Sequence, residues 1–159
     1  MNAYIDQNKY LNSPEINYNG DRPQIIKVDV NPYSISNGYL QCAIKFKSPF
    51  LLAKLNIGLV FKSANGAPIF GTNFKLHRGD MHFGDCHSGV AEVIVNELNL
   101  LSGTYSLSVY LGDQTQDYDQ KIDHVYFDFI SKHLMVENYD INIIGPLSVD
   151  ARWSLKVDY

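Results

Sequence analysis

The segment from His77 to His87 gathers several residue types that bind metal ions. Three histidines, one cysteine and two aspartates lie within these eleven residues. Imidazole, thiolate and carboxylate are ligands that zinc prefers, and a catalytic zinc site keeps one position open for water. The spacing matches neither paired CxxC motifs nor HExxH, so a polar loop between two strands is the other interpretation. One hypothesis is therefore a metal-dependent enzyme that uses His77, His82 and His87.

A second group of side chains that could bind a ligand or catalyse a reaction is the set of carboxylates in the acidic loop from Asp113 to Asp123. It lacks the D-x-D-x-D-G pattern of a calcium loop, so we expect its carboxylates to be solvated or to meet sugar hydroxyls. Glycoside hydrolysis needs two carboxyl groups on opposed walls of a cleft, and the sequence does not fix the separation of Asp113 and Asp128. The chain also has no GxSxG elbow and no cysteine–histidine signature. We therefore expect no catalytic residues and no cofactor.

Composition limits the classes of partner. With 13 basic and 17 acidic residues the formal net charge is −4, and no basic run is present, so nucleic acid is excluded as a partner. No apolar stretch approaches the ~20 residues that span a bilayer, and the first ten residues do not resemble a signal peptide. We expect a cytoplasmic protein in which Cys42 and Cys86 are small apolar side chains.

Apolar positions, which we expect to form the core, alternate with polar ones along the sequence. This period of two is typical of half-buried strands. A length of 159 residues suits one domain, and 45% hydrophobic against 19% charged residues excludes a disordered chain. The predicted inward sets are Ile26/Val28/Val30, Leu40/Cys42/Ile44/Phe46, Leu55/Ile57/Leu59/Phe61, Leu107/Val109/Leu111 and Val125/Phe127/Phe129. These short strands predict an all-β, immunoglobulin-like antiparallel sandwich over residues 24–159. Residues 1–23 are a lead-in or linker, and 139–159 supply an additional C-terminal strand.

Two local signals are more specific. Asn65-Gly66 predicts a hairpin, because both residues tolerate positive φ. Gly103-Thr104-Tyr105, at the start of a predicted strand, is the setting of a tyrosine corner, in which the phenol hydrogen-bonds to the backbone upstream. Tyr105 is therefore expected to be structural. One short helical turn is expected over Glu97 to Leu101.

The order of several short motifs along the chain resembles a known family. They are Gly66 through Gly71-Thr72-Asn73, then Leu100-Leu101-Ser102-Gly103-Thr104-Tyr105-Ser106-Leu107-Ser108-Val109, Tyr118-Asp119, Val125-Tyr126-Phe127, and Gly145 with Trp153. This pattern, from about Ile25 to Trp153, resembles the carbohydrate-binding C-terminal domain of Wzt. Wzt proteins are the ATP-hydrolysing subunits of bacterial transporters that export O-antigen polysaccharide.

The resemblance implies a function and an assembly. It implies a module that recognises the O-antigen polysaccharide, often at its modified non-reducing end, and a homodimer made by C-terminal strand exchange. It implies the transporter ATPase and permease subunits as further partners, and a cytoplasmic location peripheral to the inner membrane. The chain contains no GxxxxGK[ST] phosphate loop, so the ATPase part of such a protein is absent from it and we do not expect an enzyme.

The sequence also offers a candidate sugar-binding surface. If Thr104–Leu111 and His124–Ile130 form a hairpin around the acidic loop, one solvent-facing set of side chains comes from the two strands: Ser106, Ser108, Tyr110, His124, Tyr126 and Asp128. In the symmetric register Tyr110 pairs with His124, Ser108 with Tyr126 and Ser106 with Asp128.

Aromatic rings pack on the apolar faces of a pyranose, and polar groups satisfy its hydroxyls. Asn56 and Lys62 would extend this surface if their strand is the neighbour. The alternatives are an ordinary wet sheet face, a site at the histidine loop, or a structural, protein-binding sandwich.

Overall fold

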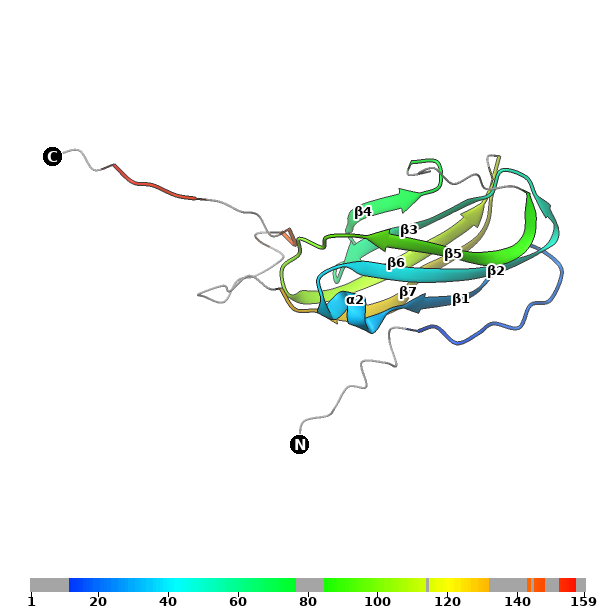
Figure 1. The fold of residues 1–159 in the computed structure, drawn as a ribbon, viewed down its shortest axis with the longest axis horizontal. Helices are drawn as coiled ribbons and strands as arrows, with labels where there is room; N and C mark the ends of the chain where they lie inside the picture. Colours follow the sequence, from blue (N-terminus) through cyan, green and yellow to red (C-terminus); the bar gives the residue numbers. More distant parts are fainter. Residues whose placement is uncertain are drawn as a thin grey trace, which may run out of the picture.

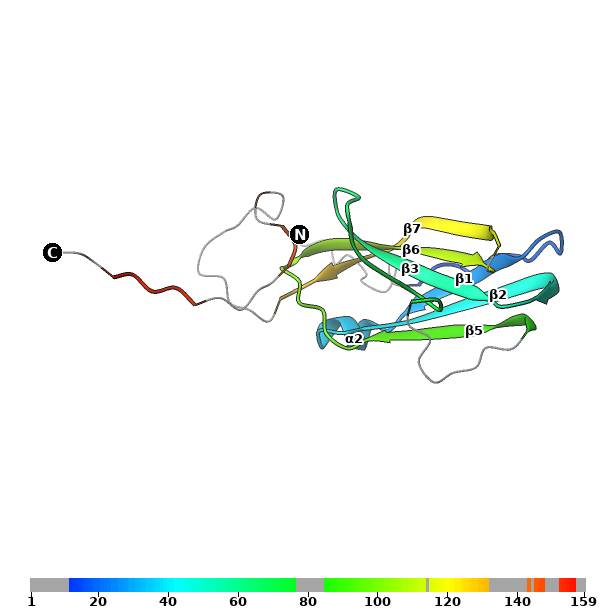
Figure 2. The same ribbon diagram turned by 90° about the horizontal axis from the view of Figure 1, so that it is seen from above.

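The strands expected from the alternating pattern are present. The computed structural model describes residues 12–76, 85–113, 115–131, 143, 145–147 and 152–156. Within them the regular elements are β1 (Gln24–Val30), α2 (Pro32–Ser36), β2 (Leu40–Leu52), β3 (Asn56–Ser63), β4 (Pro68–Asn73), β5 (Cys86–Val95), β6 (Gly103–Gly112) and β7 (Asp117–Phe129). Two antiparallel sheets form, with strand orders β1-β2-β5 and β4-β3-β6-β7. Figures 1 and 2 show them as the two layers of a sandwich, which confirms the predicted fold class.

The core lies between the two sheets and contains four of the five predicted inward sets complete. The exception is β1. A register shift between Ile25 and Lys27 places Ile25, together with Val28 and Val30, in the core. Ile26 is also buried, but it lies outside this cluster, so the prediction was wrong at this position. The cause is the extra residue of a bulge, which reverses the side to which the preceding side chain points.

Tyr105 forms the predicted tyrosine corner. Its side chain is fully buried, and its hydroxyl donates to the Leu101 carbonyl oxygen at 2.5 Å. The ring also packs at 5.3 Å, centroid to centroid, from Phe61 on β3. The phenol thus ties the chain entering β6 to the core, which leaves it no role on the surface.

Helical structure differs from the expectation. The segment Glu97 to Leu101 forms no helical turn, whereas α2 lies between β1 and β2. Asn31 caps α2, since its side chain accepts from the Tyr33 backbone N–H at 3.0 Å, and Pro32 begins the first turn. Both are standard helix-start signals, so this short helix was detectable in the sequence.

The β1 edge of its sheet is covered by the segment that precedes it. Ser13 N donates to Val28 O at 3.0 Å and Ile16 N donates to Ile26 O at 2.8 Å. Ser13 Oγ also accepts from Val28 N at 2.8 Å. Residues 12–16 therefore follow β1 closely, although they belong to the predicted lead-in 1–23.

The same side of the sandwich is also joined across the two sheets. The carboxylate of Asp119 on β7 is buried, and its Oδ2 accepts from the Ile25 N–H of β1 at 2.7 Å. A charged acceptor makes this one of the stronger kinds of hydrogen bond. We call this side, bounded by β1 and β7, the closed side.

The opposite side, bounded by β4 and β5, is less complete. Ala91, Val93 and Val95 pair with the core-facing residues of β2, yet all three remain only half-buried. No described strand pairs with the other edge of β5. Ile69 and Phe70 of β4 are also half-buried. We call this the open side.

The predicted hairpin joins β3 to β4. Ser63 N donates to Ala67 O at 2.9 Å, and Gly66 lies in its turn with a φ of 82°. The Asn65-Gly66 prediction is confirmed, because this positive φ is the conformation that glycine supplies without strain.

Besides residues 130, 131 and 143, two short segments after β7 are described. Residues 145–147 contact the sandwich, where Leu101 N donates to Pro146 O at 2.8 Å and Leu100 bridges to Leu147. Residues 152–156 lie apart from the sandwich in Figure 1 and have no strand partner among the described residues. Trp153 is 95% exposed and Leu155 is 89% exposed.

Candidate functional site

The predicted hairpin of β6 and β7 forms, but with a different register. Ser106 pairs with Tyr126, Thr104 pairs with Asp128, and Tyr110 pairs with Gln120. The symmetric register, which paired Tyr110 with His124, was therefore wrong by two residues near the start of β6 and by four at Tyr110.

The tight turn between β6 and β7, in which Asp113 N donates to Gln116 O at 3.0 Å, displaces the pairing by four residues, and a bulge in β7 then reduces the displacement to two. Between the pairs Leu107–Val125 and Val109–Lys121, one residue of β6 faces three residues of β7, from Ile122 to His124. Asp123 lies in the middle of the bulge with a φ of 47°, a conformation that aspartate tolerates better than most residues. Its backbone N–H donates to Ser108 Oγ at 2.9 Å, which holds the bulge against β6.

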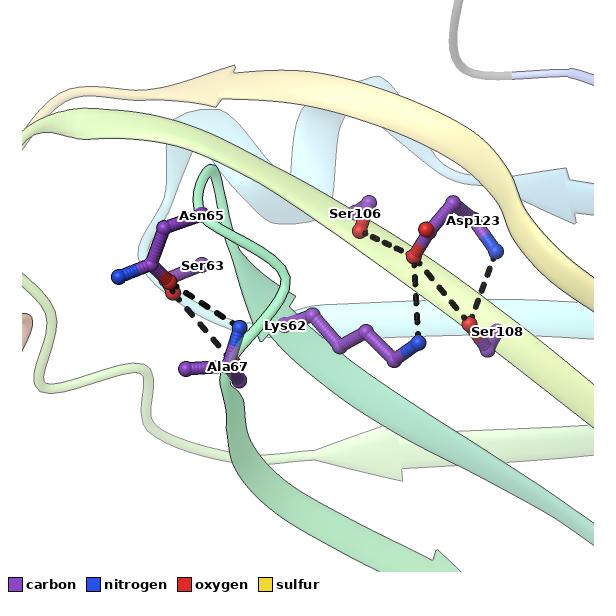
Figure 3. Close-up of polar contacts among 7 residues, drawn as sticks. All are labelled: Lys62, Ser63, Asn65, Ala67, Ser106, Ser108 and Asp123. Carbon is purple, nitrogen blue, oxygen red and sulfur yellow. Dashed lines mark hydrogen bonds and ion pairs between the residues drawn. The ribbon is translucent and has the colours of Figure 1, made fainter.

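The bulge places a carboxylate over the two predicted serines. Asp123 Oδ1 accepts from Ser106 Oγ at 3.1 Å and from Ser108 Oγ at 3.5 Å, and lies 3.3 Å from Lys62 Nζ (Figure 3). Ser106 and Ser108 are consequently buried, which contradicts the expectation that they face solvent. They form the base of a polar cluster whose accessible atoms belong to Asp123 and Lys62.

The outer face of the four-stranded sheet has a floor of small residues around this cluster. Ser108 pairs with Val60, which pairs with Gly71, and Tyr110 pairs with Gly58. At Gly58 there is no room for a side chain, since an added Cβ would lie 2.7 Å from Asn73 Cβ. Gly58 therefore permits the close approach of Asn73 on the neighbouring strand β4.

The aromatic residues of the face lie on either side of the cluster. Tyr126, 44% exposed, is beside Ser106, and half-buried Tyr110 lies four residues further along β6. That distance is about 13 Å along a strand. A ligand that contacts both rings must therefore be longer than a single sugar ring.

The remaining predicted residues of the face are differently placed. Asp128 is exposed and accepts from Thr104 Oγ1 at 2.7 Å. His124 is half-buried in the bulge, and its Nε2 atom is buried without a hydrogen-bond partner among the described residues. Burial lowers the pKa of His124, nearby Lys121 lowers it further, and Asp119 opposes both. Asn56 and Lys62 lie on β3, which is the neighbour of β6 as the sequence analysis required.

The family of the chain follows from comparison with known proteins. The family model of the Wzt C-terminal domain matches residues 34–143, which is more than half of the chain. The chain belongs to the Wzt C-terminal domain family. The matched range includes β2 to β7 and therefore the whole outer face described above.

A solved structure supports the same fold for this Wzt-family domain. The crystal structure of the C-terminal domain of Wzt aligns with a TM-score of 0.64 and 18% sequence identity, and covers 84% of this chain and 84% of that one. No curated protein sequence matches the chain significantly. In the described part of the chain, no helix has the length and apolar character needed to cross a membrane.

In the acidic loop of this Wzt-family domain, both carboxylate oxygens of Asp113 accept hydrogen bonds from residues of the same turn. Asp113 Oδ1 accepts from the Thr115 N–H and hydroxyl, both at 2.7 Å, and Asp113 Oδ2 accepts from Tyr118 Oη at 2.7 Å. These bonds hold the pKa of Asp113 well below its usual range. Asp119 Oδ2 accepts from the Ile25 backbone and Asp123 Oδ1 accepts from the two serines, so each carboxylate already forms hydrogen bonds within the domain.

The histidine hypothesis rests mostly on residues outside the described part of the chain. His77 and His82 both lie there, while His87 is exposed on β5. No group of three potential metal ligands occurs within the described residues. Burial raises the pKa of the Cys42 thiol to about 12 and that of Cys86 above its usual value, so both favour the unreactive thiol form.

Some residues of this face were missed by the sequence analysis. Asp123 was interpreted as a loop carboxylate, because the bulge that makes it part of β7 leaves no periodic signal. Gly58 and Gly71 had a usable signal, since an isolated glycine within a strand pattern marks a close approach of backbone or ligand.

Proposed function

We propose that this domain is a non-catalytic module that binds O-antigen polysaccharide for export by an ABC transporter. The proposal places the glycan on the outer face of the β4-β3-β6-β7 sheet. As such a module it works on the cytoplasmic side of the inner membrane, with the transporter ATPase and permease subunits. Family membership supports the transporter context.

The observation that carries the proposal is the layout of this face. Tyr110 and Tyr126 offer two aromatic surfaces, and between them Asp123 and Lys62 cover the buried Ser106 and Ser108. Sugars stack their C–H faces on aromatic rings and hydrogen-bond through their hydroxyls. Asp123, Lys62 and Asp128 supply acceptors and a donor beside the rings. The distance between the rings favours an oligosaccharide over a single sugar.

The test is a double variant, Tyr110→Ala with Tyr126→Ala. We expect it to keep its fold and lose binding to the O-polysaccharide of the organism that encodes it, measured by isothermal titration calorimetry. The matched control is Tyr33→Ala, which removes a tyrosine that is 67% exposed on α2, away from this face. Unchanged glycan binding by the folded double variant would contradict the proposal.

We also propose that two copies assemble by exchange of their C-terminal segments, with the β5 edge as the acceptor. Of the four sheet edges, β1 is covered by residues 12–16, β4 has only six residues, and β7 is interrupted by its bulge. β5 has ten residues and pairs without interruption from Ser88 to Val95. A long regular edge of this kind is the one that another strand can extend.

The donor segment has a matching apolar character. Trp153 and Leu155 alternate along the described segment 152–156 and are almost fully exposed in the single chain. The half-buried row Ala91, Val93 and Val95 lies beside the free edge of β5. Pairing a partner strand there would cover both sets of apolar side chains.

Two truncations test this assembly. Removal of residues 148–159 retains the contact of 145–147 with Leu101, whereas removal of everything after Asn138 does not. We expect both to be monomeric and the full chain to be dimeric, measured by sedimentation velocity. A dimer that survives the shorter truncation would contradict strand exchange, independently of the glycan proposal.

A further inference from the structure

A pocket lies at one end of the sandwich, next to the outer face but separate from its tyrosines. It has a volume of about 350 Å³ and is formed by three segments that are distant in the sequence. These are the β3–β4 turn, the first residues of β6, and residues 145–147. Pockets of this size hold small molecules or single units of larger ligands.

The pocket lining is uncharged and mainly apolar. Its walls include Pro68, Ile69, Pro146 and Leu147, and none of its described lining residues is ionisable. Its polar side chains come from Ser63, Asn65 and Thr104. Burying a charged group among these residues would cost solvation energy without a compensating ion pair. The lining therefore favours a neutral ligand that presents both hydroxyl groups and an apolar substituent.

One hydrogen-bond donor in this lining is held in a fixed orientation. Asn65 Oδ1 accepts from the Ala67 N–H at 3.0 Å and from Ser63 Oγ. The side-chain amide is thereby oriented, and Figure 3 shows its nitrogen pointing away from Ser63 and Ala67. Nδ2 makes no hydrogen bond within the described residues. Two N–H donors are thus available without any rearrangement of the turn.

The pocket adjoins the proposed glycan face through Thr104. This residue lines the pocket, pairs with Asp128, and donates its hydroxyl to that carboxylate. The next outward position on β6 is Ser106, which is paired with Tyr126. A chain that lies along β6 from Tyr110 to Tyr126 therefore reaches the pocket at its next step.

We infer that this pocket is a second carbohydrate subsite, which takes one uncharged, methyl-bearing sugar unit such as a 6-deoxyhexose. The inference rests on the proposed function, because it assigns the pocket to the same glycan. The methyl group packs against Ile69 and Leu147, and the ring hydroxyls accept from Asn65 Nδ2. The outer face binds the glycan along its length, and the pocket selects the chemistry of one unit.

The experiment uses the full chain and simple glycosides as probes. We expect methyl α-L-rhamnoside or methyl α-L-fucoside to shift the backbone amide resonances of Asn65, Gly66 and Thr104 in ¹⁵N-labelled protein. Methyl glucuronoside, which is charged, is expected to leave them unchanged. Equal shifts with the glucuronoside would overturn the assignment to an uncharged sugar.

The variant that removes the donor is Asn65→Asp, which retains the acceptor oxygen that holds the turn. It should bind the 6-deoxyhexoside at least about tenfold more weakly, the effect of losing roughly one hydrogen bond. Asn19→Asp is the matched control, because Asn19 Oδ1 also accepts a backbone N–H, from Asp21, at a site remote from the pocket. If both variants lost affinity for the 6-deoxyhexoside equally, or if neither lost affinity, the inference would be overturned.

Two further outcomes separate this inference from the proposals above. The Tyr110→Ala, Tyr126→Ala variant should lose the polysaccharide but keep the shifts caused by the 6-deoxyhexoside. If the polysaccharide binds normally and no simple glycoside shifts these amides, the subsite is wrong while the outer face stands.

Discussion

The closed and open sides of the sandwich are built from similar apolar strands, but their edge strands are covered to different extents. On the closed side the edge of β1 is covered by residues 12–16, and Asp119 joins β7 to the Ile25 backbone. On the open side Val93 and Val95 face the core, yet they stay half-buried beside an edge with no described partner. The difference indicates that the closed side stabilises the single chain, and the open side is the one that we propose is completed by association.

The largest effect on this comparison is expected from Asp119→Ala. The variant removes a charged acceptor and leaves the buried Ile25 N–H without its partner, which should lower the free energy of unfolding by about 3 kcal/mol. Chemical denaturation measures the loss. Asp119→Asn keeps an oxygen that can accept from Ile25 and should recover part of it. A loss within about 0.5 kcal/mol, as for ordinary surface substitutions, would show that the closed side does not depend on this link.

A pair of identical substitutions compares the two sides directly. Val28→Ala on β1 empties a fully buried position and should cost about 2 kcal/mol, because two methyl groups leave the core. Val93→Ala, at a half-buried position of β5, should lower the free energy of unfolding by less than about 1 kcal/mol in dilute protein. Equal losses in thermal or chemical denaturation would mean that the open side is as well packed as the closed side.

The smallest effect concerns pH. Burial lowers the pKa of His124 in the folded protein, whereas the unfolded chain takes up a proton near the ordinary value of 6.5. Stability is therefore full above that value and falls as the pH decreases through it toward the lower folded pKa. Melting temperatures from about pH 7.5 to about pH 5.5 should fall more for the native chain than for His124→Gln. His87→Gln, at an exposed position of β5, is the control, and its melting temperature should change with pH as that of the native chain does.

Much of the fold was predictable because alternation and turn chemistry are local. The strands, the Asn65-Gly66 hairpin and the Tyr105 corner all depend on residues that are close in sequence or on a simple period. Two of the wrong assignments, at Ile26 and in part at the β6–β7 register, involve bulges. A bulge adds a residue to one strand without leaving a periodic trace, and every side chain beyond it changes partner or face.

The candidate site was predictable only in part for the same reason. Tyr110 and Tyr126 lie on the face where alternation placed them, because β6 alternates regularly and Tyr126 lies beyond the bulge. The burial of Ser106 and Ser108 depends on Asp123 and Lys62, which come from two other strands. The pocket combines segments about 80 residues apart in the sequence. Contacts of this range cannot be derived from local patterns.

Among the described residues, the β1 edge is covered and the β5 edge is not, and this difference limits how the sheet could be extended by association. A sheet that is open at both ends can add neighbours without limit, which is how strand-paired filaments grow. Here residues 12–16 occupy the β1 edge, so the β1-β2-β5 sheet can be extended only at β5. The association that we propose through β5 therefore extends the sheet in one direction only, and the covered β1 edge opposes growth in the other direction.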